Sequence, residues 1–172
     1  MSDVVISRVS KLAESEIAQL AEVLVDCVEG GASVSFMLPL SHARASDFWR
    51  RVATDVAADR RILLVATDER GIVGTVQLIV DQPENQPHRA DVAKMLVHRR
   101  ARRRGIGEAL MRAAEDHARA AGKSVLVLDT ASDDAARIYE KLGWITVGAV
   151  PDYALWPAGG FCPTTFYYRK LD

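Results

Sequence analysis

The sequence has 172 residues, with 22 basic and 23 acidic side chains, a formal net charge of -1 and a pI of about 6.4. This balance excludes proteins that hold nucleic acid or an anionic membrane through an overall positive charge. With 49% hydrophobic and 26% charged residues, the composition is that of a folded protein, and the length predicts one domain over residues 1–172. The sequence has neither a signal peptide nor an apolar run of membrane-spanning length, which predicts a cytoplasmic location and no membrane partner.

The first half of the chain is predicted to contain one strand, two amphipathic helices and a β-hairpin. Hydrophobic residues recur with a period of two in the strands and at helical spacing in the helices. The hairpin turn contains Gly71, a residue type that favours turns. In chain order, the expected elements are a strand at Val4–Arg8, helices at Ser10–Val28 and Ala43–Ala58 with a loop at 30–40 between them, and strands at 62–67 and 72–80.

The second half alternates strands and helices before it ends in two further strands. A strand, a helix, a strand and a helix in succession favour a βαβ unit with parallel strands. Residues 151–160 are rich in proline and glycine and are predicted to form a loop. The expected elements are a strand at Asp91–His98, a helix at Ile106–Ala121, a strand at 124–130, a helix at Asp133–Lys141, and strands at 144–150 and 164–170.

A run of arginines followed by two glycines lies where a strand ends and a helix begins. Unpaired N–H groups and the positive end of the helix dipole can receive a phosphate at such a junction. A P-loop is excluded because Glu108 follows Gly107, and a dinucleotide fingerprint is excluded because Leu110 stands where a third small residue is needed. A solvated basic surface remains the alternative interpretation of the run.

Two motifs in this order resemble the GNAT superfamily of N-acetyltransferases: Arg102-x-x-Gly105-x-Gly107, and AARIYEKLGW at 135–144. The resemblance implies an α/β fold with a mixed, mostly antiparallel central sheet of six to seven strands, flanked by about four helices. It also implies acetyl-CoA as a cosubstrate, with its pyrophosphate on the arginine-glycine loop. The cosubstrate-binding residues that it implies are Met95, Leu96, Val97, Arg102, Arg103, Arg104, Gly105, Ile106, Gly107, Glu108, Ala136 and Tyr139.

A closer resemblance links this chain to the tabtoxin-resistance acetyltransferases, which acetylate a small amino-acid-like toxin. The matching segments are GGASVSFM at 30–37, RADVAKMLV at 89–97, LDT at 128–130 and PTTFYYRKL at 163–171. The resemblance implies acetylation of a small amine in a toxin- or antibiotic-resistance role. Asp91 stands where that pattern has a glutamate, so its carboxylate has a shorter reach and the substrate can differ.

Acetylation of an amine requires a base, because an alkylammonium is almost wholly protonated at neutral pH. Asp91 is predicted to be that base and Asp129 its partner. Alternatively, Asp129 caps a helix or makes a turn bond, while Asp91 only pairs with Arg89 or Lys94. By the resemblance, Tyr139 protonates the departing thiolate of CoA, although it could instead only pack against the CoA arm.

The acceptor end is predicted to be closed by the loop Gly31–Met37 and by the aromatic-rich segment Tyr153–Phe161, since binding residues often lie on loops held by a rigid sheet. The expected substrate contacts are Ser33, Phe36, Tyr153 and Trp156, each with packing or turn formation as the alternative. No metal site is expected, because neither the four histidines nor Cys27 and Cys162 have ligand spacing.

Three further interpretations of the function stay open. The first is acetylation of a protein N-terminus or lysine, the second is an acyl-CoA-binding module without catalysis, and the third is a protein that binds nucleotide phosphates. The resemblance also leaves a homodimer open, because dimers are common in the superfamily.

Overall fold

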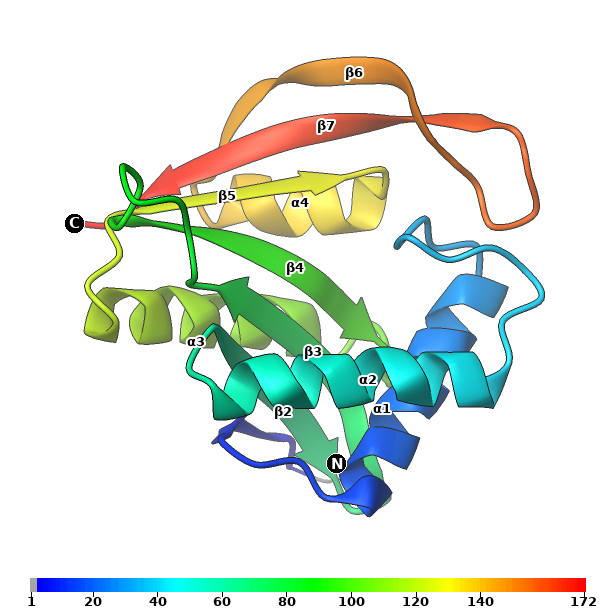
Figure 1. Cartoon of the computed structure of the whole chain (residues 1–172). Coiled ribbons are helices and arrows are strands. Elements are labelled where there is room, and N and C mark those ends of the chain that lie inside the picture. Colours follow the sequence, from blue (N-terminus) through cyan, green and yellow to red (C-terminus); the bar gives the residue numbers. More distant parts are fainter. Residues whose placement is uncertain (1–2) are drawn as a thin grey trace.

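The computed structural model describes residues 3–172, and across them it contains a seven-stranded sheet with four α-helices, which confirms the predicted fold class (Figure 1). The elements are β1 Val5–Val9, α1 Glu14–Glu29, α2 His42–Ala57, β2 Arg61–Asp68, β3 Gly71–Ile79, β4 Arg89–Val97, the short 3-10 helix η1 Arg99–Ala101, α3 Ile106–Ala120, β5 Val125–Thr130, α4 Asp133–Lys141, β6 Ile145–Leu155 and β7 Phe161–Lys170.

The strand order is β1-β2-β3-β4-β5-β7-β6, and every neighbouring pair is antiparallel except β4 and β5. The parallel pair confirms the predicted βαβ unit, in which α3 forms the crossover. Only Arg89–Asp91 of β4 pair with Val125–Val127 of β5. Beyond these residues the two strands diverge, so the middle of the sheet is split toward the carboxyl end of β4 (Figure 1).

Helices cover the sheet on both sides (Figure 1). One face, called here the α2 face, carries α1 and α2 with a core around Leu24 and Trp49. The opposite face, called the α3 face, carries α3 and α4 with a core around Leu110 and Leu126. Because successive strand residues point to opposite faces, each functional side chain can be assigned to one of them.

Several predicted boundaries were wrong: β4 begins at Arg89 rather than Asp91, and β7 begins at Phe161 rather than Thr164, because pairing with the neighbouring strands extends both. The first helix begins at Glu14 rather than Ser10, because the carboxylate of Glu16 accepts a hydrogen bond from the backbone N–H of Ala13 at 2.8 Å and fixes the first turn there. Residues 151–155, predicted to be a loop, continue β6. Ala154 and Leu155 pair with β7 beyond a register shift, and Pro151, which lies within that shift, is tolerated because β6 is an edge strand.

Candidate active site

The arginine loop, defined here as residues 98–105, connects β4 to α3. His98 caps η1 by accepting a hydrogen bond at Nδ1 from the N–H of Arg100. Arg103 and Gly105 have φ angles of 59° and 73°, and this left-handed backbone turns the chain into α3. No atom lies within 4 Å of the position that a Cβ of Gly105 would take. The first turn of α3 is therefore open to an approaching group.

Gly107 is required for a different reason, namely the packing of α3 against its neighbours. A Cβ at this position would lie 2.9 Å from Cδ1 of Ile138 on α4 and 3.5 Å from Sδ of Met95 on β4. The missing side chain thus lets the start of α3, α4 and β4 meet. The same junction sets the position of Tyr139, the residue after Ile138.

Two buried aspartates anchor the arginine loop, and both were missed by the sequence analysis as site residues. Asp68, at the end of β2, pairs with Arg100 at 2.8 Å and with Arg104 at 3.5 Å. The hydrogen bond from Arg100 is the largest cause that lowers the pKa of Asp68 to about 2. Asp26 on α1 accepts bonds from the backbone N–H and Nε of Arg99 at 2.8 and 2.9 Å. Arg99, Arg100 and Arg104 therefore fix the conformation of the arginine loop through these ion pairs.

Two of the remaining charged residues of the predicted phosphate site, Arg102 and Glu108, are held by other groups. Arg102 donates from Nε to the carbonyl oxygen of Val97 at 3.2 Å, and Arg103 is exposed. Glu108 accepts hydrogen bonds from Lys141 at 2.6 Å and from Arg112 at 2.9 Å. Both bonds lower the pKa of Glu108, and the bond from Lys141 has the larger effect. Glu108 consequently links α3 to α4, and Ile106 is buried in the α3-face core.

β4 carries a bulge just before the arginine loop. Leu96 lies opposite Thr75, and Ala93 lies opposite Gln77, so Lys94 and Met95 together face a single residue of β3. Lys94 has a φ of 51°, which is uncommon for a residue with a Cβ. Bulges re-aim side chains beside active sites. Here the bulge directs Met95 to the α3 face and Lys94 to the α2 face.

The two predicted catalytic carboxylates lie on the α2 face, one where β4 and β5 are paired and the other where they diverge. Asp91 pairs with Val127 where β4 and β5 are still joined, and its carboxylate binds Arg89 and the amide of Gln82. Asp129 lies two residues further along β5, beyond the last paired residues, and accepts a hydrogen bond from the hydroxyl of Thr164 at 2.8 Å. Only Asp129 therefore lies beside the divergent part of the strands.

Tyr139 lies on the opposite side of the sheet from Asp129. It is buried in the α3-face core, with ring centroids 5.8 Å from those of Trp144 and Tyr167. Burial is the main cause that raises the pKa of its hydroxyl, and the charge of Asp129 adds to it. Ala136, one turn earlier on α4, packs against the same core. The phenol consequently stays protonated throughout the physiological pH range.

The predicted substrate loops lie together at one end of the molecule. Ser33 donates to the carbonyl oxygen of Leu155 at 3.0 Å, and the backbone N–H of Leu38 donates to Pro157 at 2.9 Å. Residues 31–40, called here the acceptor loop, are thereby fastened to the tip of the β6–β7 hairpin (Figure 1). Trp156 closes that tip, because its backbone N–H donates to the carbonyl oxygen of Gly160.

The aromatic residues border the same region. The ring of Phe36 lies edge-on to that of Phe48, with centroids 5.3 Å apart. Tyr153 makes a similar contact with Phe166 on β7 at 5.7 Å. Since Phe166 pairs with Asp129, it shares the α2 face with that carboxylate. The structure thus brings Phe36, Tyr153 and Asp129 to one side of the sheet.

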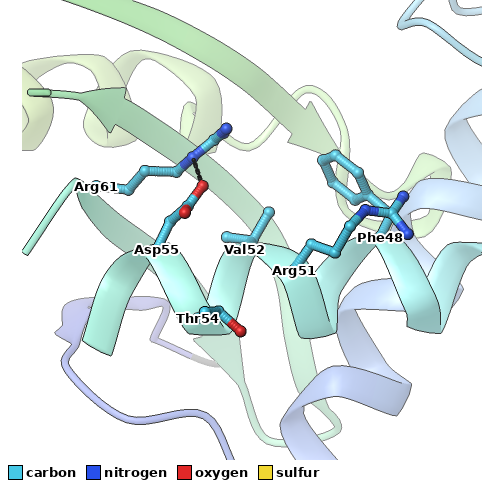
Figure 2. Close-up of a pocket in the computed structure, with 6 residues that line it drawn as sticks. All are labelled: Phe48, Arg51, Val52, Thr54, Asp55 and Arg61. Atoms are coloured by element: carbon cyan, nitrogen blue, oxygen red, sulfur yellow. Dashed lines mark hydrogen bonds and ion pairs between the residues drawn. The ribbon is translucent and has the colours of Figure 1, made fainter. Parts of the chain in front are cut away.

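A cavity of about 400 Å³ opens beside α2 (Figure 2). It is lined by Phe48, Arg51, Val52, Thr54 and Asp55 of α2 and by Arg61 of β2. Figure 2 shows the ion pair between Arg61 and Asp55, whose Nε and Oδ2 atoms are 2.9 Å apart.

In residues 3–172 no cluster of three His, Cys, Asp or Glu side chains can hold a metal ion, and both cysteines are buried and free. None of the described helices is long and apolar enough to cross a membrane.

Comparisons with known proteins identify the class to which this fold and loop belong. A family model described as acetyltransferase (GNAT) family matches residues 32–144. An uncharacterised N-acetyltransferase from the hisH-hisA intergenic region of Azospirillum brasilense is 28% identical over 170 residues, which cover 94% of this chain and 97% of the relative. The chain belongs to the acetyltransferase (GNAT) family.

Solved structures share the fold at low sequence identity. The protein yncA from Salmonella typhimurium, solved with its cofactor acetyl-CoA, has a TM-score of 0.78 at 19% identity, over 98% of this chain and 94% of that one. A phosphinothricin acetyltransferase from Sinorhizobium meliloti, in complex with acetyl-CoA, has a TM-score of 0.80 at 19% identity, over 98% of this chain and 88% of that one.

Proposed function

We propose that this chain, as one domain, transfers the acetyl group of acetyl-CoA to the amine of a small molecule by direct attack in a ternary complex. The observation that carries the proposal is the split between β4 and β5, which has the arginine loop at its open end and Asp129 beside it. Membership of the acetyltransferase family and two relatives solved with acetyl-CoA support the choice of cosubstrate.

The residues around the arginine loop fit a diphosphate. Gly105 leaves open space above the first turn of α3, whose N–H groups have no partner within the helix. Arg102 and Arg103 are exposed beside it. Met95, Leu96 and Val97 lie on the divergent part of β4, and their backbone is proposed to hold the pantetheine arm. Acetyl-CoA would supply an acyl group activated as a thioester.

Asp129 is proposed to accept the proton of the acceptor amine, directly or through water. Its carboxylate borders the divergent strands, whereas that of Asp91 is engaged by Arg89 and Gln82. This geometry favours Asp129 over Asp91 as the base, and Asp91 is proposed to be its partner. Such proton transfer typically accelerates a reaction about 100- to 10,000-fold. Asp129→Asn should therefore lose far more turnover than Asp91→Asn, and pH–rate profiles of both variants from pH 6 to 9 test this.

Tyr139 is proposed to donate a proton to the leaving thiolate from the α3 face. The hydroxyl is protonated at neutral pH, since burial raises its pKa further above that range. The base and the acid then lie on opposite faces of the sheet, with the split between them. After transfer, Asp129 releases its proton to solvent and Tyr139 regains one from solvent, so that both groups are restored for the next turnover.

A small acceptor, with an amino-acid-like toxin or antibiotic as the first candidate, fits the closed end of the α2 face. The acceptor loop is bonded to the β6–β7 hairpin, which leaves less room for an extended peptide. The phosphinothricin acetyltransferase among the relatives supports a small amine. A screen of small amines, amino acids and N-terminal peptides with acetyl-CoA, followed by thiol release, tests the acceptor class. Faster acetylation of peptides would overturn the small-molecule assignment.

The cosubstrate site has a matched pair of glycines for its test. Gly105 and Gly122 have φ angles of 73° and 74°, and at neither residue does an atom lie within 4 Å of the position that a Cβ would take, so a side chain imposes similar strain at both. Calorimetry should show that Gly105→Trp abolishes coenzyme A binding while Gly122→Trp retains it. Equal affinities in the two variants would place the diphosphate elsewhere.

A homodimer through β6 is the further part of the proposal. β6 is an edge strand that is exposed along nearly its whole length, and it carries the exposed apolar side chains of Ile145, Val147 and Val150. An apolar edge of this length favours pairing with a second copy. Light scattering should give a dimer that Val147→Lys dissociates and that Val5→Lys, on the opposite edge, does not. A monomeric parent chain would contradict the proposal.

A further inference from the structure

The bulge of β4 places one cation, Lys94, on the α2 face without an acidic partner. Its Nζ lies 3.3 Å from the hydroxyl of Ser35 in the acceptor loop and 5.7 Å from the centroid of the Phe48 ring. The side chain is half-buried between these groups. In the part of the chain that the structure describes, no carboxylate oxygen lies within the 4.0 Å of an ion pair to this ammonium group.

The charges around Lys94 leave it short of negative charge. Burial, followed by the charge of Arg61, lowers the pKa of Lys94, and Asp129 only partly opposes this effect. A half-buried ammonium beside a second cation is unfavourable unless an anion joins it. Asp55 does not fill that place, because it is bound to Arg60 and Arg61.

Hydrogen-bond donors are in excess at the same place. Gln77, opposite the bulge on β3, accepts a bond at Oε1 from Arg61 at 2.7 Å, which orients its amide so that Nε2 is the donor. This Nε2 is buried and has no acceptor among the described residues. Lys94, Arg61 and Gln77 thus form a cluster of donors beside the cavity of Figure 2, which Arg61 lines.

We propose that Lys94 binds an anionic group of the acceptor, a carboxylate, and so selects amines that also carry one. The inference rests on the proposed acetyltransfer function and adds the substrate class and the residue that determines it. Lys94 on β4 and Asp129 on β5 share the α2 face across the split between the strands. An acceptor with a carboxylate and an amine can therefore bind Lys94 with one end and present the other end to Asp129.

The same placement gives the bulge a role at this residue. A regular β4 would alternate without the extra residue, and Lys94 would then point to the α3 face, where the core is apolar. The left-handed φ of Lys94 is the conformation that accompanies this change of direction. The strain is thus located where a charged group must face the acceptor.

The test measures acceptor discrimination by the full-length protein. The twenty amino acids and phosphinothricin are assayed with acetyl-CoA, and the best acceptor is compared with its own carboxamide. One charge-assisted hydrogen bond predicts that kcat/KM favours the carboxylate by about 10- to 100-fold in the parent protein. Lys94→Met should reduce this ratio to near one, mainly through KM, and Lys94→Arg should restore most of it.

The possible outcomes distinguish failure of the Lys94 inference from failure of the proposed acetyltransfer function. If the parent protein acetylates carboxylates and carboxamides equally, or if Lys94→Met slows both by the same factor, Lys94 does not select the carboxylate. If Lys94→Met keeps the ratio but moves the pH–rate profile, Lys94 acts in proton transfer instead, and the inference fails. If coenzyme A binds but no amine is acetylated, the proposed function itself fails, and the inference fails with it.

Discussion

A side chain at position 107 should destabilise the protein, because Gly107 packs closely against Ile138. Gly107→Ala places a Cβ 2.9 Å from Cδ1 of Ile138, closer than carbon atoms normally approach. Ile138 must then shift, or α3 must move away from α4. Because the contact is with the terminal methyl group of a side chain that can move, the cost lies in the lower part of the roughly 1–3 kcal/mol that is typical of overpacking. Alanine in place of glycine within a helix returns up to about 1 kcal/mol. The free energy of unfolding should therefore fall by about 0–2 kcal/mol.

The same substitution should stabilise the protein when Ile138 is first shortened. In an Ile138→Ala background the contact at Cδ1 is gone, and the nearest remaining atom is Sδ of Met95 at 3.5 Å, an ordinary contact. Only the gain in helix propensity then remains, up to about 1 kcal/mol. The sign of the effect of Gly107→Ala should consequently reverse between the two backgrounds.

Urea unfolding of the four proteins in this double-mutant cycle measures the coupling between the two positions. We expect an interaction energy of about 1–3 kcal/mol, well above the roughly 0.3–0.5 kcal/mol of independent sites. Coenzyme A titrations of the same proteins should show weaker binding in Gly107→Ala and recovery in the double variant. Additive unfolding energies would refute the view that Gly107 is needed for this contact.

The remaining predictions concern Asp68 and Tyr139. Because the folded-state pKa of Asp68 is lowered from 3.8 to about 2, its contribution to stability is present above pH 4 and is lost as the pH falls toward 2. Asp68→Asn should lower the melting temperature at pH 7 and flatten its dependence on pH between 4 and 2; an unchanged slope would exclude this linkage. Tyr139→Phe should lower kcat at least about 100-fold with little change in acetyl-CoA affinity, and an unchanged kcat would remove the acid role.

Local patterns were enough to predict most elements of this fold. The helix Asp133–Lys141 has the predicted bounds, since Ser132 accepts a hydrogen bond from the N–H of Ala135 and fixes the start. The hairpin of β2 and β3 and the parallel pairing of β4 and β5 were likewise predicted. Periodicity, caps and turn residues act within a few positions along the chain, so a sequence displays them directly.

The extension of β6 was decided by its partner rather than by its own residues. Pro151 and the glycines after it favour a loop, but pairing with β7 carries the strand to Leu155. The position of β7 between β5 and β6 is likewise a property of the whole sheet. Strand pairing joins residues distant in sequence, and local propensity is overridden where such pairing is available.

For the candidate site, the sequence by itself determined the motifs: Arg102, Gly105 and Gly107 at a strand-to-helix junction, and Tyr139 on the following helix. Only the tertiary structure decided which charges meet. It engages Asp91 with Arg89 and Gln82, joins Asp68 to the arginine loop, and turns Lys94 through a bulge to the α2 face. The reason is physical: a motif fixes backbone geometry over a few residues, whereas an ion pair or an uncompensated charge depends on which distant side chains the folded sheet brings within a few ångströms.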